Sequence, residues 1–534
     1  MSTAWDLRAE VVVLGFGAAG ACAAIEAATG GADVLVLDRF HGGGTTAISG
    51  GVVYAGGGTS VQAAAGVSDT PEALLAYLRE EVGDAVSAET LRRFCAGSRD
   101  LVEWLRRHGV PFEGSLCPYK TSYPDDRYHL YFSGSESSGH FRRFAVPAPR
   151  GHRAKGRGTS GSALFAALAA ATRRLGVRWQ PQTLGERLIV EQGRVTGIQC
   201  RTLAHAPRSV RLRHRLLSRY AASPGVYLPW LRTLLHRRVT RLEQRHGRLL
   251  RVGAGKGVVI AAGGFVANRA MLAEHAPNAR GCLPLGTPGD DGSGITMAVE
   301  AGAATAHLDR VSAWRFLSPP SAFLHGLLVN RHGARVIDES RYGAAVGEVL
   351  LTEHDGKGWL LVDRDIVARA RRQLAHQALW FQRVGAYMQL AARHTAPTLE
   401  AVAARAGVDP AGLRATVEEH HRRLAQRRPD PTGRPEELAR PLHAPYSLVE
   451  VSIRGRRVPP CPVLPLGGLV VDERTGAVRR PDGSTVPGLY AAGRSAVGLC
   501  SRSYVSGLSL ADCVFSGRRA GAHLAATRRS GAHR

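Results

Sequence analysis

The feature that most constrains this chain is a glycine-rich turn between two short apolar runs. Val11–Leu14 leads directly into Gly15-Phe16-Gly17-Ala18-Ala19-Gly20, small residues continue to Ala28, and Val34–Leu37 follows. This pattern predicts a strand, a helix and a second strand. In such a unit Gly15 permits the tight turn, Gly17 lets the backbone approach a pyrophosphate, and Gly20 lets helix and strand pack closely. Ala18 and Ala19 then begin a helix whose N-terminus faces the phosphates, so the unit predicts a bound dinucleotide.

An acidic residue at the end of the second run strengthens this prediction. Asp38 lies eighteen residues beyond Gly20 and directly after Leu37. An acid at this place typically hydrogen-bonds a ribose 2′-hydroxyl. The alternative, a glycine-rich turn without a ligand, does not account for the acid.

Two later segments repeat the pattern of a buried strand followed by glycine. They are Val258–Gly264 and Gly488–Gly493. We therefore expect one α/β sheet, Rossmann-like, with strands from both ends of the chain, and 534 residues exceed what one core normally holds. The predicted division is 1–283 and 458–534 for the dinucleotide domain and 284–457 for a smaller capping domain. Helices are expected in the cap at Thr398–Ala406, with Thr398 as its cap, and at Asp409–Ala425.

The C-terminal pattern favours FAD over NAD. After Gly493 a helix is expected from about Leu508, and a helix N-terminus aimed at a flavin favours the negative charge of its reduced form. A second GxGxxG that could bind a nicotinamide is missing. The electron acceptor is therefore expected to be a quinone, a flavoprotein or oxygen.

The strong positive charge is concentrated in one segment. The formal net charge is +26, and residues 201–251 hold thirteen arginines and a single acid, Glu243. No nucleic-acid-binding signature accompanies the charge, so no nucleic-acid partner is predicted. Leu, Tyr and Trp residues lie among the arginines at 212–238, a mixture that suits peripheral docking on an anionic membrane. A solvated helical hairpin packed on its own domain is the alternative.

Cysteine spacing and the N-terminal sequence indicate the compartment. The eight cysteines are widely separated without a CxxC pair, which predicts reduced thiols and no metal site. The sequence MSTAWDLRAE lacks the basic and apolar regions of a signal peptide, and no apolar run is long enough to span a bilayer. We expect a cytoplasmic protein, with possible peripheral contact on the inner membrane surface.

Three segments together resemble the succinate dehydrogenase and fumarate reductase flavoprotein superfamily. They are Gly42–Gly51 (GGGTTAISGG), Gly289–Gly294 (GDDGSG) and the C-terminal strand and helix. The resemblance implies an FAD domain interrupted by a cap over the flavin. The resemblance also implies cofactor contacts in addition to the glycine motif and Asp38. These are Gly44, Thr45, Thr46, Ser49, Gly50, Gly51, Ala262, Gly263, Asp291, Gly493, Ser509 and Leu510.

The same resemblance predicts how the flavin is held. Respiratory members attach FAD to a histidine just before the Thr that corresponds to Thr45, where this chain has Gly44. Non-covalent FAD is therefore expected, and His41 is the alternative attachment point.

The positions that hold a dicarboxylate in fumarate reductases are changed here. The corresponding stretches are Leu464–Gly468 (LPLGG) and Ser503–Gly507 (SYVSG), with Tyr504 in place of the arginine. A phenol is a poor partner for a carboxylate but a good hydrogen-bond donor to a ketone oxygen. The substrate is expected to be a neutral ketone.

The chain also resembles the 3-ketosteroid dehydrogenases, most closely those of the Δ4-(5α) type. The resemblance is carried by GGTTAISGGVVYAGGGT at 43–59, PRGHRAKGRGTSG at 149–161, GLYAAGRSAVG at 488–498 and SYVSGLSLADCVFSGRRAG at 503–521. It implies that Tyr504 binds the 3-keto oxygen, that Ser506 removes a proton from carbon 4 and that Tyr342 assists Ser506 and passes the proton outward. Hydride from carbon 5 would pass to FAD.

The chemistry of these three residue types agrees with that assignment. Removing a proton next to a ketone needs a donor that stabilises the developing enolate, and serine needs a neighbour that relays its proton. In the alternative interpretation, Tyr504 and Ser506 merely cap the helix at Leu508. Other functions left open are a Δ1-dehydrogenase, a reductase of another enone, and an electron-transfer flavoprotein subunit without its own substrate.

Overall fold

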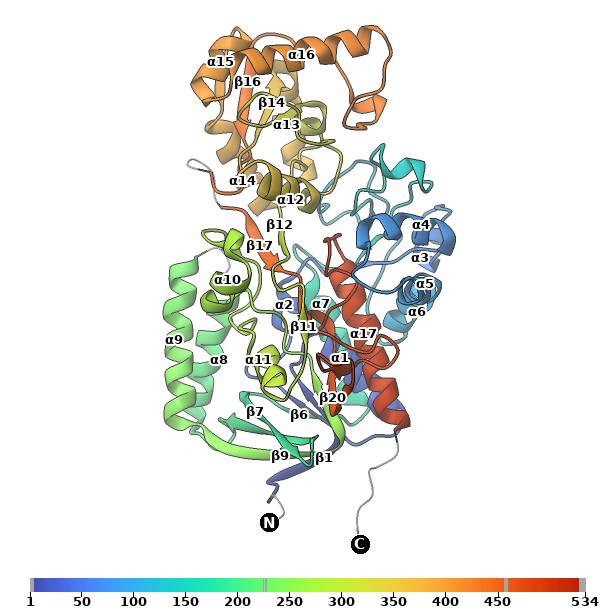
Figure 1. Ribbon diagram of the computed structural model, residues 1–534, viewed down its shortest axis with the longest axis vertical. Coiled ribbons are helices and arrows are strands. Elements are labelled where there is room, and N and C mark those ends of the chain that lie inside the picture. The colour runs from blue at the N-terminus through green and yellow to red at the C-terminus, as the bar shows by residue number, and fades with distance from the viewer. Residues whose placement is uncertain (1–3, 224, 226–227, 456–459, 528–534) are drawn as a thin grey trace.

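A mostly parallel sheet, built from both ends of the chain, forms the base of the molecule (Figure 1). The computed structural model describes residues 4–223, 225, 228–455 and 460–527. The strand order is β19-β20-β9-β1-β2-β6, and all neighbours except the β19–β20 pair are parallel. The strands of this order are β1 (Leu7–Leu14), β2 (Val34–Leu37), β6 (Arg178–Gln180), β9 (Arg248–Ile260), β19 (Ala477–Arg479) and β20 (Thr485–Ala491). Two more, β7 (Thr183–Glu191) and β8 (Arg194–Thr202), extend the sheet antiparallel from β9. The predicted α/β class and the discontinuous sheet are confirmed.

Two helices of small residues cover one face of this sheet. Helix α1 (Ala18–Thr29) connects β1 to β2, and α17 (Leu508–Ala526) lies beside it although it comes from the C-terminus (Figure 1). A Cβ atom at Gly517 would come within 2.4 Å of the Ala19 carbonyl oxygen, and one at Gly521 within 2.3 Å of the Ala23 oxygen. Glycine at these positions therefore lets the two backbones pack closely.

A second unit lies above the first in Figure 1 and has its own hydrophobic core. Its four-stranded antiparallel sheet has the order β13 (Leu327–Val329), β14 (Trp359–Asp363), β16 (Tyr446–Glu450) and β15 (His394–Ala396). Its helices are α12 (Gly343–Glu353), α13 (Arg364–Gln377), α14 (Trp380–Ala391), α15 (Leu399–Ala406) and α16 (Pro410–Ala425). Thr398 caps α15 as predicted and Asp409 caps α16. We keep the domain limits 283/284 and 457/458 as a proposal.

Short strands connect the two units. β10 (Leu283–Pro284), β17 (Pro462–Pro465) and β12 (Val311–Ala313) form one small sheet, and β11 (Thr305–Ala306) pairs with β18 (Gly468–Leu469). A further sheet contains β3 (Val52–Tyr54), β5 (Gly151–Arg153) and β4 (Leu130–Tyr131). Further helices are α3 (Ser60–Ala64), α4 (Pro71–Val82), α5 (Ala88–Ala96), α6 (Ser98–Arg107), α7 (Gly161–Arg174), α10 (Arg269–His275) and α11 (Ser293–Glu300).

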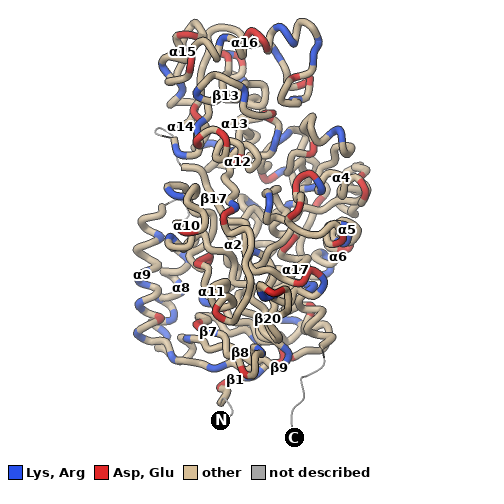
Figure 2. The backbone as a smooth tube through the Cα atoms, viewed as in Figure 1, with Lys and Arg blue, Asp and Glu red and all other residues tan. Residues whose placement is uncertain are grey.

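The basic segment forms a helical hairpin between two strands. β7 (Thr183–Glu191) pairs with β8 (Arg194–Thr202), and α8 (Arg208–Ala222) and α9 (Pro229–His246) separate β8 from β9. Residues 224, 226 and 227 at its turn lie outside the described residues. Figure 2 shows arginines along both helices. Among the described helices, none has the length and apolar character needed to cross a membrane.

Candidate active site

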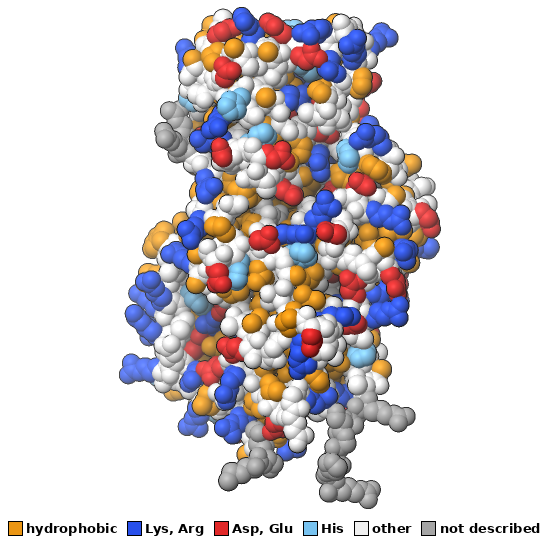
Figure 3. All heavy atoms as spheres, in the orientation of Figure 1, with side chains coloured by type: hydrophobic (Ala, Val, Ile, Leu, Met, Phe, Trp, Pro, Cys, Tyr) orange, Lys and Arg blue, Asp and Glu red, His pale blue; other side chains and the backbone are white. Residues whose placement is uncertain are grey.

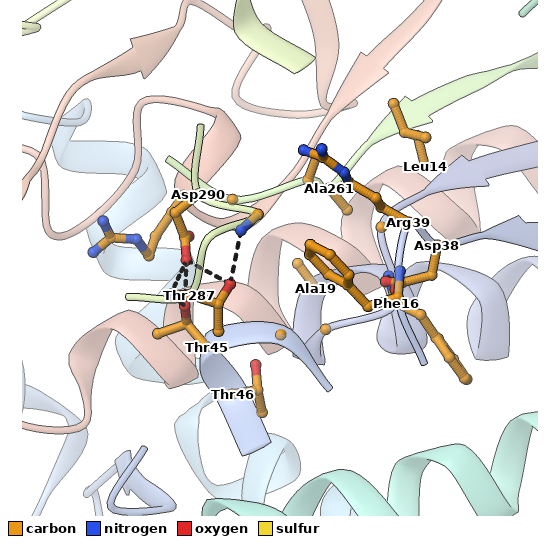
Figure 4. A pocket seen from close by; sticks show the side chains of 18 of the residues that line it. Leu14, Phe16, Ala19, Asp38, Arg39, Thr45, Thr46, Ala261, Thr287 and Asp290 are labelled. Atoms are coloured by element: carbon orange, nitrogen blue, oxygen red, sulfur yellow. Dashed lines mark hydrogen bonds between the residues drawn. The ribbon is translucent and has the colours of Figure 1, made fainter. Parts of the chain in front are cut away.

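A cleft opens where β1, β2 and β9 end (Figure 4). The carboxyl ends of parallel strands are the usual place for a bound nucleotide in an open α/β sheet. Of the predicted cofactor contacts, those that line the cleft are Gly15, Gly17, Ala18, Ala19, Asp38, Gly44, Thr45, Thr46, Ala262, Gly263 and Asp291. Residues from four separate parts of the chain are thus brought together.

The other predicted contacts lie behind or beside the cleft. Gly20 packs against the turn, since its Cβ would lie 1.9 Å from the Gly15 carbonyl oxygen, and Gly493 packs against Ala19. Ser49, Gly50 and Gly51 follow the short helix α2 (Gly44–Ile48), whereas Ser509 and Leu510 lie in the first turn of α17. Their contact with a cofactor stays a prediction.

The glycine turn leaves room for a ligand beside Gly17 and Gly44. A Cβ at Gly15 would lie 2.4 Å from the Ala261 carbonyl oxygen, and φ there is +101°, so only glycine fits this turn. At Gly17 the nearest atom to such a Cβ is the Thr46 hydroxyl oxygen at 3.4 Å, and at Gly44 no atom lies within 4 Å. The cleft side of the turn is therefore open, as a pyrophosphate requires.

Asp38 organises the turn. Its carboxylate accepts hydrogen bonds from the backbone N–H groups of Phe16 at 2.8 Å, Phe40 at 2.8 Å and Gly42 at 3.1 Å. Burial raises the pKa of Asp38 from its usual value, although these three bonds oppose the shift. The side chain lines the cleft, and its predicted bond to a ribose stays a prediction.

Asp290 is a cleft residue that the sequence analysis missed in favour of its neighbour. The Thr45 hydroxyl donates to its carboxylate at 2.5 Å, and the Thr287 N–H and hydroxyl donate at 2.7 and 3.1 Å (Figure 4). Asp291, the predicted contact, also lines the cleft and accepts a hydrogen bond from Arg39 at 2.9 Å. Its contact with a cofactor stays a prediction.

Arg39 ties the basic hairpin to the cleft, and no sequence pattern indicated this. Its guanidinium donates to the carboxylate of Glu243 on α9 at 2.8 and 3.0 Å. His214 of α8 lies 3.1 Å from the same carboxylate and stacks on Phe40. Burial alone would raise the pKa of Glu243, but the hydrogen bonds with His214 and Arg39 lower it to about 2. Glu243, the single acid of residues 201–251, is thus buried and attaches the hairpin to Arg39 at the cleft.

Arg494 also lines the cleft and was missed. Its Nη2 donates to the Pro465 carbonyl at 3.3 Å, whereas its buried Nε has no hydrogen-bond partner among the described residues. Buried donors are nearly always paired, so an unpaired one in a cleft points to a missing ligand. This observation fits a bound flavin. His41, the alternative covalent attachment point, is absent from the cleft lining, and burial lowers its pKa to about 4.

A cluster of hydroxyl side chains contains the three predicted catalytic residues. Tyr504 and Ser506 lie in the loop before α17, and Tyr342 directly precedes α12. The Tyr342 and Tyr504 rings are stacked with centroids 6.4 Å apart. Trp314 lies against Tyr504 with centroids 4.8 Å apart, and Phe316 against Tyr342 at 5.4 Å. The cluster is therefore walled by aromatic rings.

Tyr131 of β4 completes this cluster. Its hydroxyl oxygen lies 3.3 Å from Oγ of Ser506, and its side chain is fully buried. The Ser133 hydroxyl donates to the Ser506 carbonyl at 3.0 Å, so the residues after β4 also hold the loop. Tyr131 lies in a tyrosine-rich stretch with Tyr119, Tyr123 and Tyr128, and no local pattern distinguishes it from them.

Burial keeps these phenols neutral. It holds the pKa of Tyr131 and Tyr342 well above the usual value of 10, and in both cases the Ser506 side chain opposes the shift. Burial raises the pKa of Tyr504 in the same way. All three can therefore act as hydrogen-bond donors at neutral pH.

The alternative in which Tyr504 and Ser506 cap the C-terminal helix is wrong. The residue at the N-cap of α17 is Gly507, with φ +91°, and no side chain caps that end. A Cβ at Gly507 would lie 2.8 Å from the Tyr54 nitrogen, which donates to the Gly507 carbonyl at 3.0 Å. The loop is held by β3, and the Ser506 hydroxyl is free to face the cluster.

Comparisons with known proteins identify the family of the chain. A family model described as an FAD binding domain matches residues 10–507. The chain belongs to the FAD-binding succinate dehydrogenase and fumarate reductase flavoprotein family. FAD is thus the cofactor of this family member, and the cleft residues above are the ones available to hold it.

Among members of this family, the curated and solved relatives include steroid enzymes. The chain is 35% identical to the 3-oxo-5-alpha-steroid 4-dehydrogenase of Comamonas testosteroni, over 92% of this chain and 93% of that one. The crystal structure of 3-ketosteroid-delta4-(5alpha)-dehydrogenase from Rhodococcus jostii RHA1, in complex with 4-androstene-3,17-dione, superposes with a TM-score of 0.82 at 30% identity, covering 99% of both chains. The 3-ketosteroid delta1-dehydrogenase of Sterolibacterium denitrificans shares the fold, with a TM-score of 0.64 at 19% identity over 98% and 100% of the chains.

Proposed function

We propose that this protein is an FAD-dependent dehydrogenase that introduces the C4–C5 double bond into 3-keto-5α-steroids. The observation that carries the proposal is the position of the Ser506 side chain. Ser506 and Tyr504 belong to the same loop before α17, and the side chains of Tyr131 and Tyr342 lie beside Ser506. A serine base with phenol neighbours and a phenol donor suits proton removal next to a neutral ketone. The activities of the Comamonas and Rhodococcus relatives support the same substrate class.

Each residue then has a definite part in the reaction. Tyr504 donates a hydrogen bond to the 3-keto oxygen and stabilises the enolate that develops on it. Ser506 accepts the proton from carbon 4 while its own hydroxyl proton passes to the phenol oxygen of Tyr342 or Tyr131, and that phenol releases its proton outward to solvent. The electron pair of the broken C4–H bond forms the new double bond as hydride leaves carbon 5. When bound, the flavin accepts that hydride.

The proposal is tested by dye reduction with the purified flavoprotein. A panel of 3-keto-5α-steroids, 4-ene-3-ketosteroids and dicarboxylates separates the candidates. We expect turnover with the 5α-steroids and a 4-ene product by mass spectrometry and NMR. A 1-ene product would show a Δ1-dehydrogenase instead, dye reduction by succinate alone would overturn the ketone assignment, and no turnover with any substrate would favour an electron-transfer subunit.

The flavin is proposed to be non-covalent and to pass its electrons to an acceptor other than NAD. Gly44 offers no side chain for attachment, and His41 does not line the cleft. Acid precipitation is expected to release the yellow cofactor into the supernatant, whereas yellow colour retained in the pellet would contradict this. The acceptor is tested by replacing the dye with a quinone, a flavoprotein, oxygen or NAD.

We propose that the hairpin α8–α9 binds an anionic membrane surface peripherally, on the cytoplasmic face. Leu212, Leu216 and Tyr220 form an exposed stripe at helical spacing on α8, and Trp230 on α9 is 67% exposed. Figure 3 shows blue Lys and Arg side chains gathered along the left edge, over the hairpin. Arginines beside exposed Leu and Trp favour anionic headgroups and the layer beneath them.

Point variants test the hairpin better than a deletion, because Glu243 and Arg232 are buried anchors. The Arg232 guanidinium donates to the Gly286 and Thr287 carbonyls at 3.0 and 2.7 Å, so deletion would disturb the cleft. Leu216→Gln/Trp230→Gln is expected to lower co-sedimentation with anionic liposomes at low salt. Unchanged co-sedimentation, or no binding by the unaltered protein, would support the solvated hairpin instead.

A further inference from the structure

Helix α14 exposes an apolar stripe that the hairpin proposal does not explain. Trp380, Val384, Tyr387 and Met388 are 73%, 52%, 45% and 49% exposed, and they recur at the spacing of one helix face. The buried residues of the same helix, Ala386 and Leu390, lie on another side of it. An exposed apolar stripe of this size is typical of a surface that binds a membrane or another molecule.

The surroundings of the stripe are basic. Residues 364–391, which form α13 and α14, contain five arginines and one acid, Asp365. Arg364, Arg371 and Arg372 are exposed on α13, next to the stripe in sequence, and Asp365 is already paired with Arg440 at 2.6 Å. Large apolar side chains flanked by exposed arginines match an anionic lipid surface more closely than they match a second copy of this basic chain.

The junction of α13 and α14 rests on the loop beside the catalytic cluster. The carbonyl of His376 accepts hydrogen bonds from Arg127 at 2.6 Å and from Tyr119 at 3.5 Å. The Gln382 amide donates to the Tyr123 carbonyl at 3.4 Å. The Tyr123 hydroxyl in turn donates to the carbonyl of Gly50 at 2.7 Å, in the segment that follows α2. Only this loop therefore separates a membrane or molecule bound to α14 from the cluster of Tyr342, Tyr504 and Ser506.

We infer that the stripe of α14 inserts into the surface of an anionic bilayer and marks the side from which an apolar substrate enters. The inference rests on the proposed function for the identity of that substrate, but its membrane contact does not depend on it. Figure 2 draws α14 and the hairpin on the same side of the molecule. The tyrosine loop 119–128 then lies between the bilayer and the catalytic cluster.

Vesicle binding of the full-length holoenzyme tests the contact. The probe is a set of phosphatidylcholine vesicles with and without one quarter phosphatidylglycerol, at low and high salt. Trp380→Gln/Met388→Gln, which keeps good helix formers, is expected to lower the bound fraction about tenfold. Arg371→Gln/Arg372→Gln is expected to lower binding at low salt only. The control Val190→Ser/Val299→Ser removes exposed apolar side chains from β7 and α11 and should bind as the unaltered protein does.

Turnover of delivered substrate separates this inference from the proposed function. With a 3-keto-5α-steroid loaded into the vesicles, the α14 variant should react several-fold more slowly, whereas with the steroid dispersed by cyclodextrin it should match the unaltered enzyme. Unchanged vesicle binding by the α14 variant would overturn the inference, as would a dimer in sedimentation that the variant abolishes. Loss of vesicle binding without steroid turnover by any form would leave the membrane contact standing and overturn only the proposed substrate.

Discussion

The hydroxyl oxygen of Tyr131 lies 3.3 Å from Oγ of Ser506, although 375 residues separate the two in the chain. Tyr131 belongs to β4 and Ser506 to the loop before α17, and the sheet β3-β5-β4 brings them together. Ser506 therefore has two phenol neighbours, Tyr131 and Tyr342. A serine base with two routes for its proton is less dependent on either one.

Single and double variants of the phenols test this redundancy. Ser506→Ala is expected to lower turnover by roughly 10²–10⁴-fold, the usual effect of removing a general base. Tyr131→Phe and Tyr342→Phe should each cost less than Ser506→Ala, and the double variant should cost more than the product of the single effects. Stopped-flow reduction of the flavin measures the step directly. Tyr446→Phe, on β16, is the matched control, and a fully active Ser506→Ala would remove the assigned base.

Replacing the donor at position 504 should affect turnover more than binding. Tyr504→Phe removes the hydrogen bond to the developing enolate, so we expect roughly a 10²–10³-fold loss in kcat, as for one donor of an oxyanion hole. The change in KM should be small because the ring remains. An equal rise in KM with kcat unchanged would show that Tyr504 only binds the ketone.

The pH profile should show no loss of activity from phenol ionisation up to about pH 10. Burial holds the pKa of Tyr131 and Tyr342 above their usual value of 10, so both stay protonated through that range. The measurement is kcat/KM against pH for the unaltered enzyme and Tyr342→Phe. A descending limb below pH 9 that disappears in Tyr342→Phe would contradict the prediction.

Substitution of two glycines of the same motif should affect different properties, namely fold stability for Gly20 and FAD binding for Gly17. A Cβ at Gly20 would lie 1.9 Å from the Gly15 carbonyl oxygen, so Gly20→Ala should lower the stability of the fold itself. At Gly17 the closest atom is 3.4 Å away, so Gly17→Ala should fold but hold less FAD. Thermal unfolding of the apoprotein and the flavin absorbance per protein distinguish the two. Equal thermal stability in both variants would argue against the packing role of Gly20.

The buried pair of Glu243 and Arg39 should make stability depend on pH in the acid range. Hydrogen bonds lower the pKa of Glu243 from 4.5 to about 2 in the folded protein, despite burial. The folded state therefore binds fewer protons than the unfolded chain, and the contribution, about 3 kcal/mol, is present above pH 4.5 and lost as pH falls toward 2. Glu243→Gln should remove this dependence and lower stability at pH 7 by roughly 3 kcal/mol.

Unfolding by urea at several pH values measures this effect. The control is Glu72→Gln, an exposed residue at the start of α4, which should change stability little. Flavin release followed in parallel shows whether the anchor also affects the cleft through Arg39. An unchanged pH profile in Glu243→Gln would assign the acid sensitivity to another carboxylate.

The local parts of this fold could be predicted from sequence, because short-range patterns determine them. Val34–Leu37 and the start of α17 at Leu508 agree with the structure, and Thr398 caps its helix as expected. The glycine spacing also identified the part of the cleft lining that Gly15, Gly17, Ala18 and Ala19 form. Each of these features depends on residues close together in the chain.

The missed residues depend on contacts between distant segments. The Arg39–Glu243 pair joins residues 204 apart, and no periodicity indicates it. Asp290 and Asp291 are adjacent and both line the cleft, but it is Asp290 that bonds to Thr45, a contact between residues 245 apart in the chain. The phenol at Tyr131 was one of several in a tyrosine-rich region. Tertiary packing selects among such equivalent candidates, and spacing does not.

The arrangement of the sheet has a consequence for synthesis of the protein. Strand β20 and helix α17 come from the last fifty residues, yet β20 pairs with β9 and α17 covers α1 near the start. While the ribosome is still translating, the small apolar face of α1 lacks its permanent neighbour. The cofactor domain therefore closes late, after most of the chain has been synthesised. Because Ala492, Arg494 and Cys513 line the cleft, its lining is complete only once this last segment exists.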